Sequence, residues 1–294
     1  MTRIAIQFSR FSAFYSPLIA TEAAGFLKEE GLEAEFSVSP PGVSAIAALL
    51  AGEVQVIQSA PSQGLSDLAR GEAPRALHFA QINEMDGFFL AARDADPDFA
   101  WSKLAGRQVL VDHGGQPLAM FKYACRKQGL DYQAIEAEDA GNTAEMEIAF
   151  RDGRGDFIHL QGPAPQQLAH DGVGHVVASV GKAIGPCAFS SLASTREWLD
   201  SEMAGAFMRA YRKARAWINA VPAAEVAAAE AAHFPGIEAG VLAETIGFYQ
   251  KLGCWSPHVE ITREAFEVTC DVYRNIGREV EGDAYAAVVA APPA

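Results

Sequence analysis

The sequence predicts an α/β protein built from two doubly wound α/β lobes with a ligand cleft between them. Segments with strand-like alternation are followed by helical segments along the first 190 residues, which favours parallel sheets with helices on both faces. A faint internal repeat supports two lobes, because Gly153 follows Gly52 by 101 residues and Pro163 follows Pro61 by 102. The chain of 294 residues is long enough for two cores. Proteins of this kind usually bind ligands between their lobes.

The first lobe is predicted from alternation and from residues that start or stop helices. Pro17 suits the first turn of a helix, Gly31 ends that helix, and Ser44 is a plausible N-cap. Pro40-Pro41-Gly42 reads as a loop. The predicted strands are 3–8, 32–38, 54–58 and 75–80, and the predicted helices are 17–30, 45–51 and one opened by 59–62 that ends near Gly71.

The second lobe repeats this scheme. Its predicted strands are 88–93, 107–111, 132–136, 156–160 and 176–180, and its predicted helices are 118–128, 144–151 and one opened by 161–163. The strand 88–93 crosses between the lobes, and 184–193 leads back. We therefore assign residues 1–90 and 190–294 to the first lobe and 91–189 to the second.

The C-terminal third is predicted to be helical. Apolar residues at helical spacing, such as Phe207, Tyr211 and Ile218, indicate helices whose aromatic side chains belong to the core. The Ala/Pro-rich tail 286–294 is expected to fray.

Composition excludes several functions. The formal net charge of −14 and the pI of about 4.9 argue against nucleic acid and anionic membranes as partners. No apolar run approaches the roughly 18 residues of a membrane span, so we expect no membrane insertion. The four cysteines lack zinc or redox spacing, and we expect no metal and no cofactor. No signal peptide is visible, which predicts a periplasmic location if an export signal was removed and a cytoplasmic one if Met1 is the native start.

The candidate ligand site consists of loops that follow predicted strands, because ligands of open parallel sheets lie beyond the carboxyl ends of the strands. Helix starts in these loops offer unpaired N–H groups, small residues allow close approach, and aromatic rings offer stacking faces. No catalytic residue is assigned. The candidate ligand-binding residues are Phe8, Arg10, Phe11, Phe14, Tyr15, Gly42, Ser59, Ser62, His113, Gly114, Gln116, Gln161, Cys187 and Phe189.

Several of these residues admit two interpretations. Arg10 is either a bidentate clamp on an oxyanion or a solvated arginine at the rim. Ser59 and Ser62 either donate to a ligand or cap the following helix. Asp112-His113 is either a turn or an acid/base pair, and Cys187 either faces the cleft or packs as a buried thiol.

Three segments carry a resemblance to a known family. They are 15–35, which contains Gly25-Phe-Leu-Lys-Glu-Glu-Gly-Leu32, then 49–56 and 104–111. Over residues 1–200 the chain resembles solute-binding proteins of the nitrate/sulfonate/taurine type, in the SsuA/THI5-like, NMT1-like superfamily that includes thiamine-pyrimidine synthases. The resemblance implies a type II periplasmic-binding-protein fold. It also implies hinge closure around a small sulfonate, carboxylate or aromatic heterocycle, and delivery to an ABC permease.

Two other functions remain open. A cytosolic enzyme on the same scaffold would use His113, Asp112 and Cys187, and a cytosolic sensor would only bind. The synthase relatives need a histidine and a lysine at positions near Gln63 and Ser59, and the desulfinase relatives need a first-lobe cysteine, whereas no cysteine precedes Cys125. General hydrolase, zincin and P-loop motifs are also missing.

Overall fold

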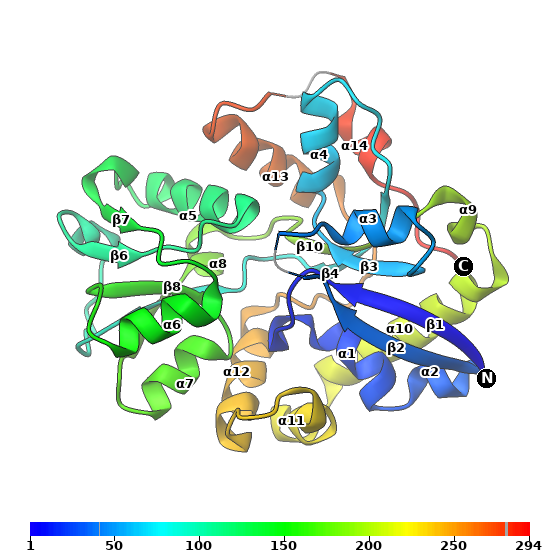
Figure 1. Cartoon of the computed structure of the whole chain (residues 1–294), viewed down its shortest axis with the longest axis horizontal. Helices are drawn as coiled ribbons and strands as arrows, with labels where there is room; N and C mark the ends of the chain where they lie inside the picture. Colours follow the sequence, from blue (N-terminus) through cyan, green and yellow to red (C-terminus); the bar gives the residue numbers. More distant parts are fainter. Residues whose placement is uncertain (41, 280–281) are drawn as a thin grey trace.

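A computed structural model describes residues 1–40, 42–279 and 282–294, so Pro41 of the predicted loop lies outside the described residues. It confirms the predicted α/β class. Two five-stranded sheets lie side by side, with strand orders β2-β1-β3-β10-β4 and β7-β6-β8-β5-β9. Figure 1 shows β1 to β4 of the first sheet in blue and cyan on the right and β6 to β8 of the second sheet in green on the left.

The first sheet is formed by the N-terminal segment and one returning strand. Its strands are β1 (Thr2–Phe8), β2 (Leu32–Val38), β3 (Val56–Ser59), β4 (Leu77–Asn83) and β10 (Ser190–Ser194). The connecting helices are α1 (Ser16–Ala23), α2 (Phe26–Glu29), α3 (Ala45–Leu50) and α4 (Ser62–Ala69). In Figure 1, α3 and α4 lie above this sheet and α1 and α2 below it, so the buried strands β3 and β4 are covered on both faces.

The second sheet follows the same plan. Its strands are β5 (Phe88–Ala92), β6 (Gln108–Leu110), β7 (Glu136–Glu138), β8 (Phe157–Gln161) and β9 (His175–Ser179). Its helices are α5 (Gly115–Lys127), α6 (Thr143–Arg151), α7 (Ala164–His170) and α8 (Val180–Ile184). The repeated segments, which run from Gly52 to Pro61 and from Gly153 to Pro163, contain β3 and β8. Both strands occupy the middle position of their sheets. The internal repeat in the sequence therefore corresponds to a repeated topology.

One strand of each sheet departs from the predicted parallel arrangement. β10 is antiparallel to β3 and β4, and β5 is antiparallel to β8 and β9. These are the two strands through which the chain enters the second lobe and returns to the first. Alternation in the sequence carries no information on strand direction, so the prediction was wrong here. The predicted lobe boundary at residue 90 falls inside β5, and the lobe limits stay a prediction.

Three local predictions were also wrong. The helix predicted over 17–30 is split into α1 and α2, because Gly25 adopts a left-handed conformation with φ of 81°. The strand predicted over 132–136 is a 3-10 helix at Tyr132–Ala134 followed by β7. The tail is not frayed: it forms α14 (Ala284–Val288), and the Ala290 N–H donates to the carbonyl of His78 at 2.9 Å.

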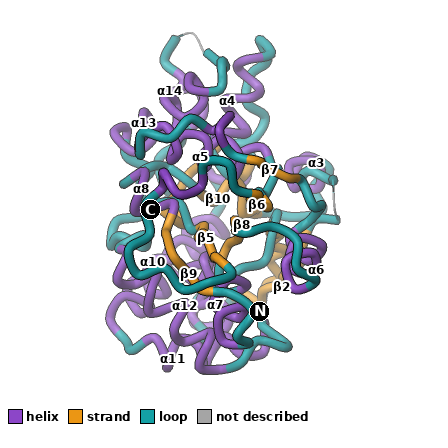
Figure 2. The backbone as a smooth tube through the Cα atoms, turned by 90° about the vertical axis from the view of Figure 1, so that its left-hand side faces the viewer, coloured by secondary structure: helices purple, strands orange, loops and turns teal. Residues whose placement is uncertain are grey.

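The predicted C-terminal helices are present and contact both lobes. They are α9 (Arg196–Leu199), α10 (Glu202–Ala220), α11 (Ala223–Glu230), α12 (Ala239–Leu252) and α13 (Arg263–Asn275). α10 packs on α1, whereas α12 packs on α7 and α13 packs on α5 of the second lobe. Figure 2 shows α11 and α12 toward one end of the molecule and α13 and α14 toward the other. None of the described helices has the length and apolarity needed to cross a membrane.

Buried groups fix the two chain crossings between the lobes. The backbone N–H of Cys187, on the return crossing, donates to the carbonyl of Glu84, on the outward crossing, at 2.8 Å. The Trp255 indole N–H contacts the Phe14 carbonyl at 3.0 Å and the Asn83 side-chain oxygen at 2.8 Å. The two crossings are thus hydrogen-bonded to each other and to the first lobe.

Candidate functional site

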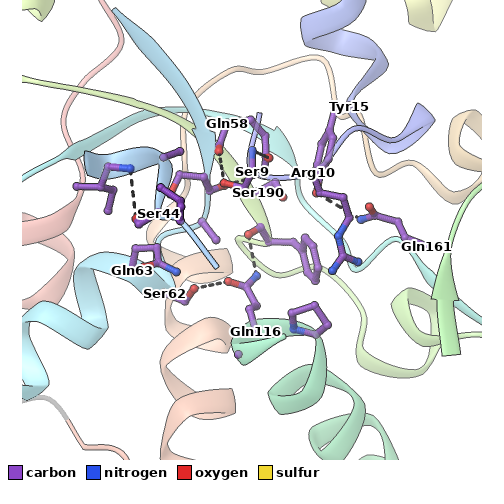
Figure 3. A pocket seen from close by; sticks show the side chains of 18 of the residues that line it. Ser9, Arg10, Tyr15, Ser44, Gln58, Ser62, Gln63, Gln116, Gln161 and Ser190 are labelled. Carbon is purple, nitrogen blue, oxygen red and sulfur yellow. Dashed lines mark hydrogen bonds between the residues drawn. The ribbon is translucent and has the colours of Figure 1, made fainter. Parts of the chain in front are cut away.

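A cleft of about 530 Å³ lies between the two lobes. Its lining combines hydroxyl and amide side chains with aromatic rings, as Figure 3 shows for the labelled polar residues. The described lining residues are Ser9, Arg10, Tyr15, Gly42, Val43, Ser44, Ala45, Ile46, Gln58, Ser59, Ala60, Ser62, Gln63, Phe88, Gly115, Gln116, Pro117, Gln161, Phe189 and Ser190. A volume of this size is typical of small-molecule sites.

The first lobe supplies most of this lining from strand ends and helix starts. Ser9 follows β1, and its hydroxyl donates to the Gln58 carbonyl at 2.9 Å while its N–H donates to the Gln58 side chain at 3.0 Å. Ser44 caps α3 by accepting from the Ile46 N–H. Ser59 ends β3 and Ser62 begins α4. The predicted position beyond the carboxyl ends of the strands is therefore where the cleft lies.

The second lobe contributes fewer side chains, and Gln116 among them is hydrogen-bonded to the first lobe. The Ser62 hydroxyl donates to the Gln116 side-chain oxygen, and the Gln116 amide donates to the Phe189 carbonyl at 2.8 Å. On the other side, the Ser12 hydroxyl donates to the Gly162 carbonyl at 2.6 Å. Direct hydrogen bonds thus join the two lobes at the cleft, and we call this arrangement closed.

Arg10 forms an ion pair across the cleft, and its role toward a ligand stays a prediction. Its Nη1 lies 2.7 Å from Oδ2 of Asp112, which follows β6 of the second lobe. Burial lowers the pKa of Arg10, but the charge and hydrogen bond of Asp112 outweigh this and leave that pKa raised. Burial likewise raises the pKa of Asp112, and Arg10 reverses the shift so that the pKa is lowered overall. Both groups are charged, and each neutralises the other.

Aromatic rings form the apolar part of the lining. Phe88, Tyr15 and Phe189 line the cleft, and the Arg10 guanidinium lies 5.5 Å from the centre of the Phe88 ring. Behind Phe88, the His159 ring is stacked between Phe88 at 4.6 Å and Phe121 at 4.7 Å. Both ring nitrogens of His159 are buried without a hydrogen-bond partner among the described residues, and burial lowers its pKa to about 3. His159 is neutral and supports the aromatic wall.

Eight of the fourteen predicted residues line the cleft, and six lie elsewhere. The eight are Arg10, Tyr15, Gly42, Ser59, Ser62, Gln116, Gln161 and Phe189. Phe8, Phe14 and Cys187 are fully buried in the core. Phe11 faces a neighbouring groove, and His113 and Gly114 lie in the loop before α5. Contact with a ligand stays a prediction for all of them.

The candidate catalytic groups do not converge. The His113 Nδ1 contacts its own loop at the Val111 carbonyl, 2.7 Å away, and lies 4.0 Å from Asp139, whereas Asp112 pairs with Arg10. Burial raises the pKa of the Cys187 thiol. Among the described residues, no group of three His, Cys, Asp or Glu side chains could hold a metal ion.

Sequence reasoning did not name several lining residues, among them Ser9, Gln58, Phe88 and Ser190. Ser9, Gln58 and Ser190 lie in loops that the sequence indicates as candidate ligand loops, at strand ends or on the return crossing. Phe88 lies on the outward crossing, and no sequence signal pointed to it, because its place at the cleft depends on the antiparallel pairing of β5.

Comparisons with known proteins agree on the fold. The alkanesulfonate-binding protein SsuA from Xanthomonas axonopodis pv. citri is 16% identical with a TM-score of 0.73, over 98% of this chain and 98% of that chain. The periplasmic nitrate-binding protein NrtA from Synechocystis PCC 6803 is 14% identical with a TM-score of 0.65, over 90% and 75%. The predicted type II periplasmic-binding-protein fold is thereby confirmed.

Sequence comparison leads to the family. "Putative binding protein YtlA" from Bacillus subtilis (strain 168) is 26% identical over 272 residues, which are 91% of this chain and 81% of that protein. The model of the family described as NMT1/THI5 like matches residues 13–225, well over half of the chain. With the repeated lobes and the cleft between them, this match shows that the chain belongs to the NMT1/THI5-like family.

Proposed function

We propose that this protein is the ligand-binding component of an ABC import system and closes its two lobes around a small organic molecule. The observation that carries the proposal is the cleft of about 530 Å³, which is lined from both lobes and bordered by hydrogen bonds between them. Family membership and the names of the relatives support it, since they include sulfonate-binding and nitrate-binding proteins. A permease is the partner that this function requires.

Closure of the two lobes around a ligand is the basis of the proposed import function. The hydrogen bonds that link the lobes, such as Ser62 to Gln116 and Ser12 to Gly162, can form only when the lobes approach each other. A ligand that contacts both lobes binds the closed state better than the open one and shifts the population toward it. The closed state is then the form that a permease can distinguish from the empty protein.

The cleft chemistry fits binding better than catalysis. Of the described lining residues, the serines are the possible nucleophiles, and none of the others is a His, Asp, Glu or Lys that could act as their base. The lining offers hydroxyls, amides and aromatic rings, which orient a ligand without transforming it.

The proposal is tested by screening purified protein for ligands by thermal shift and calorimetry, followed by mass spectrometry of each bound compound. A ligand at about 100 times its Kd should stabilise the protein by about 2.7 kcal/mol. We expect at least one small organic compound to bind in a 1:1 ratio and to be recovered unchanged. Chemical conversion of the bound compounds would overturn the proposal in favour of an enzyme.

A further inference from the structure

We infer that Asp112 sets the charge selectivity of the cleft: by holding Arg10 in an ion pair between the lobes, it makes the cleft accept uncharged ligands in preference to anions. This inference rests on the proposed binding function and specifies the ligand class of that same site. It distinguishes this chain from a binding protein whose cleft arginine is free to clamp an anion.

The charge of the cleft is compensated within the protein. Of the described lining residues, Arg10 alone is charged. Its guanidinium is held from two directions, by Asp112 at 2.7 Å and by the Phe88 ring at 5.5 Å. The one positive charge that could attract an anion is therefore already compensated by a fixed negative charge of the protein.

Separating the ion pair of Arg10 and Asp112 would cost free energy. The Asp112 side chain is only 6% exposed, and its other oxygen, Oδ1, accepts the Gly114 N–H at 2.8 Å. An anion that displaced Asp112 from Arg10 would leave the buried carboxylate without its counter-charge, which is strongly unfavourable. An anion that instead bound the guanidinium N–H groups not used by Asp112 would lie beside the negative charge of that carboxylate. An uncharged ligand meets neither penalty.

The cleft also presents polar and apolar groups to an uncharged ligand. The Gln161 side-chain oxygen is buried without a hydrogen-bond partner among the described residues, and its amide group points toward Arg10 and Tyr15 in Figure 3. Buried acceptors of this kind call for a donor. Phe88 and Phe189 add apolar faces. The ligand class is thus an uncharged molecule with an N–H or O–H donor and an apolar or planar part.

The test uses two probes of nearly equal shape, benzenesulfonate and the uncharged benzenesulfonamide, with calorimetry on the wild type and on Asp112→Asn. Asparagine keeps an oxygen for the Gly114 N–H, so the loop is retained while Arg10 loses its counter-charge. Asp112→Ser is a second variant in case the first does not fold, and thermal unfolding checks both. Asp139→Asn is the matched control, because it removes an exposed acid of the same lobe without touching Arg10.

We expect Asp112→Asn to bind benzenesulfonate at least about tenfold more tightly than the wild type, with no gain in Asp139→Asn. Wild-type binding of benzenesulfonate that Arg10→Gln abolishes would overturn the inference and leave the import function standing. Failure of both Asp112 variants to gain anion binding would overturn it as well. A gain of anion binding in Asp112→Asn would sustain the inference even if the ligand screen found no ligand for the wild type, which would count against the import function alone.

Discussion

The two lobes share a strand order but differ in what their loops carry. In the first lobe, the loops after β1 and β3 and the start of α3 present Ser9, Ser59 and Ser44 to the cleft. In the second lobe, the corresponding loops carry Asp112, Gln116 and Gln161, of which Asp112 pairs with Arg10 and Gln116 with Ser62 across the cleft. The same topology thus carries most of the cleft lining in the first lobe and the side chains that bond across the cleft in the second.

We therefore expect the two lobes to contribute differently to ligand binding. We expect a ligand to bind first to the first lobe, because this lobe supplies most of the lining, and the bonds between the lobes to form afterwards. Changes in the first lobe should therefore alter what binds, and changes in the second lobe should alter how long it stays bound.

Ala60→Trp should have the largest effect, because it puts a bulky ring on the first-lobe surface of the cleft, where Ala60 is partly exposed. We expect the affinity for the best ligand of the screen to fall about a hundredfold or more, which corresponds to roughly 2.7 kcal/mol or more. Calorimetry measures the affinity and thermal unfolding verifies the fold. Unchanged affinity in a folded variant would mean that the ligand does not occupy this surface.

His159→Phe tests the aromatic support of the second lobe through pH. The folded-state pKa of His159 is lowered from 6.5 to about 3, so its contribution to stability is present above pH 6.5 and is lost as the pH falls toward 3. Between pH 8 and pH 5 the wild type should lose about 2 kcal/mol through this residue, and the variant should not. Urea unfolding at both pH values measures the difference.

The matched first-lobe variant is His78→Phe. His78 is also buried with a pKa lowered to about 3, but its Nδ1 contacts the Ser191 hydroxyl at 2.6 Å. This variant should remove a similar pH dependence yet be less stable than the wild type at pH 8, because it leaves a buried hydroxyl without this partner. Equal behaviour of the two variants at pH 8 would show that the Ser191 contact contributes nothing.

Gln116→Ala should weaken closure without changing the first-lobe surface. It removes the bonds to Ser62 and to the Phe189 carbonyl, and we expect about a tenfold loss of affinity, mainly through faster dissociation. Stopped-flow kinetics separates the two rates. If Gln116→Ala instead slowed association and left dissociation unchanged, the second lobe would belong to the initial binding surface.

Two helix caps should give the smallest effects and the sharpest contrast. Ser44 caps α3 beside the cleft, and Asn142 caps α6 in a capping box with Glu145 away from it. Each change to alanine should cost about 1 kcal/mol of stability. Only Ser44→Ala should also change ligand affinity, which calorimetry on both variants would check; an equal loss of affinity in Asn142→Ala would point to a general effect of stability.

Much of the fold could be predicted because local patterns determine it. The order of strands and helices in both lobes follows from alternation, and the repeat at Gly52 and Gly153 located the equivalent strands β3 and β8. What local patterns could not give is direction and long-range pairing. The antiparallel crossings β5 and β10 and the docked tail at His78 depend on contacts far apart in the sequence.

The candidate site shows the same limit. Loop positions predicted Ser59, Ser62, Gln116 and Gln161 at the cleft, because strand ends meet there. The partner of Arg10 could not be predicted, since Asp112 is 102 residues away and approaches only when both lobes are in place. Phe8 and Phe14 lie next to the cleft residues in sequence, but their side chains pack into the core instead.

The most direct test of the account is small-angle X-ray scattering of the protein with and without a saturating ligand from the screen. If the lobes close, the radius of gyration falls on ligand binding and the liganded curve matches the closed arrangement, in which Ser12 contacts Gly162 and Ser62 contacts Gln116. Identical curves with and without a ligand bound in a 1:1 ratio would contradict closure of the lobes as the basis of function.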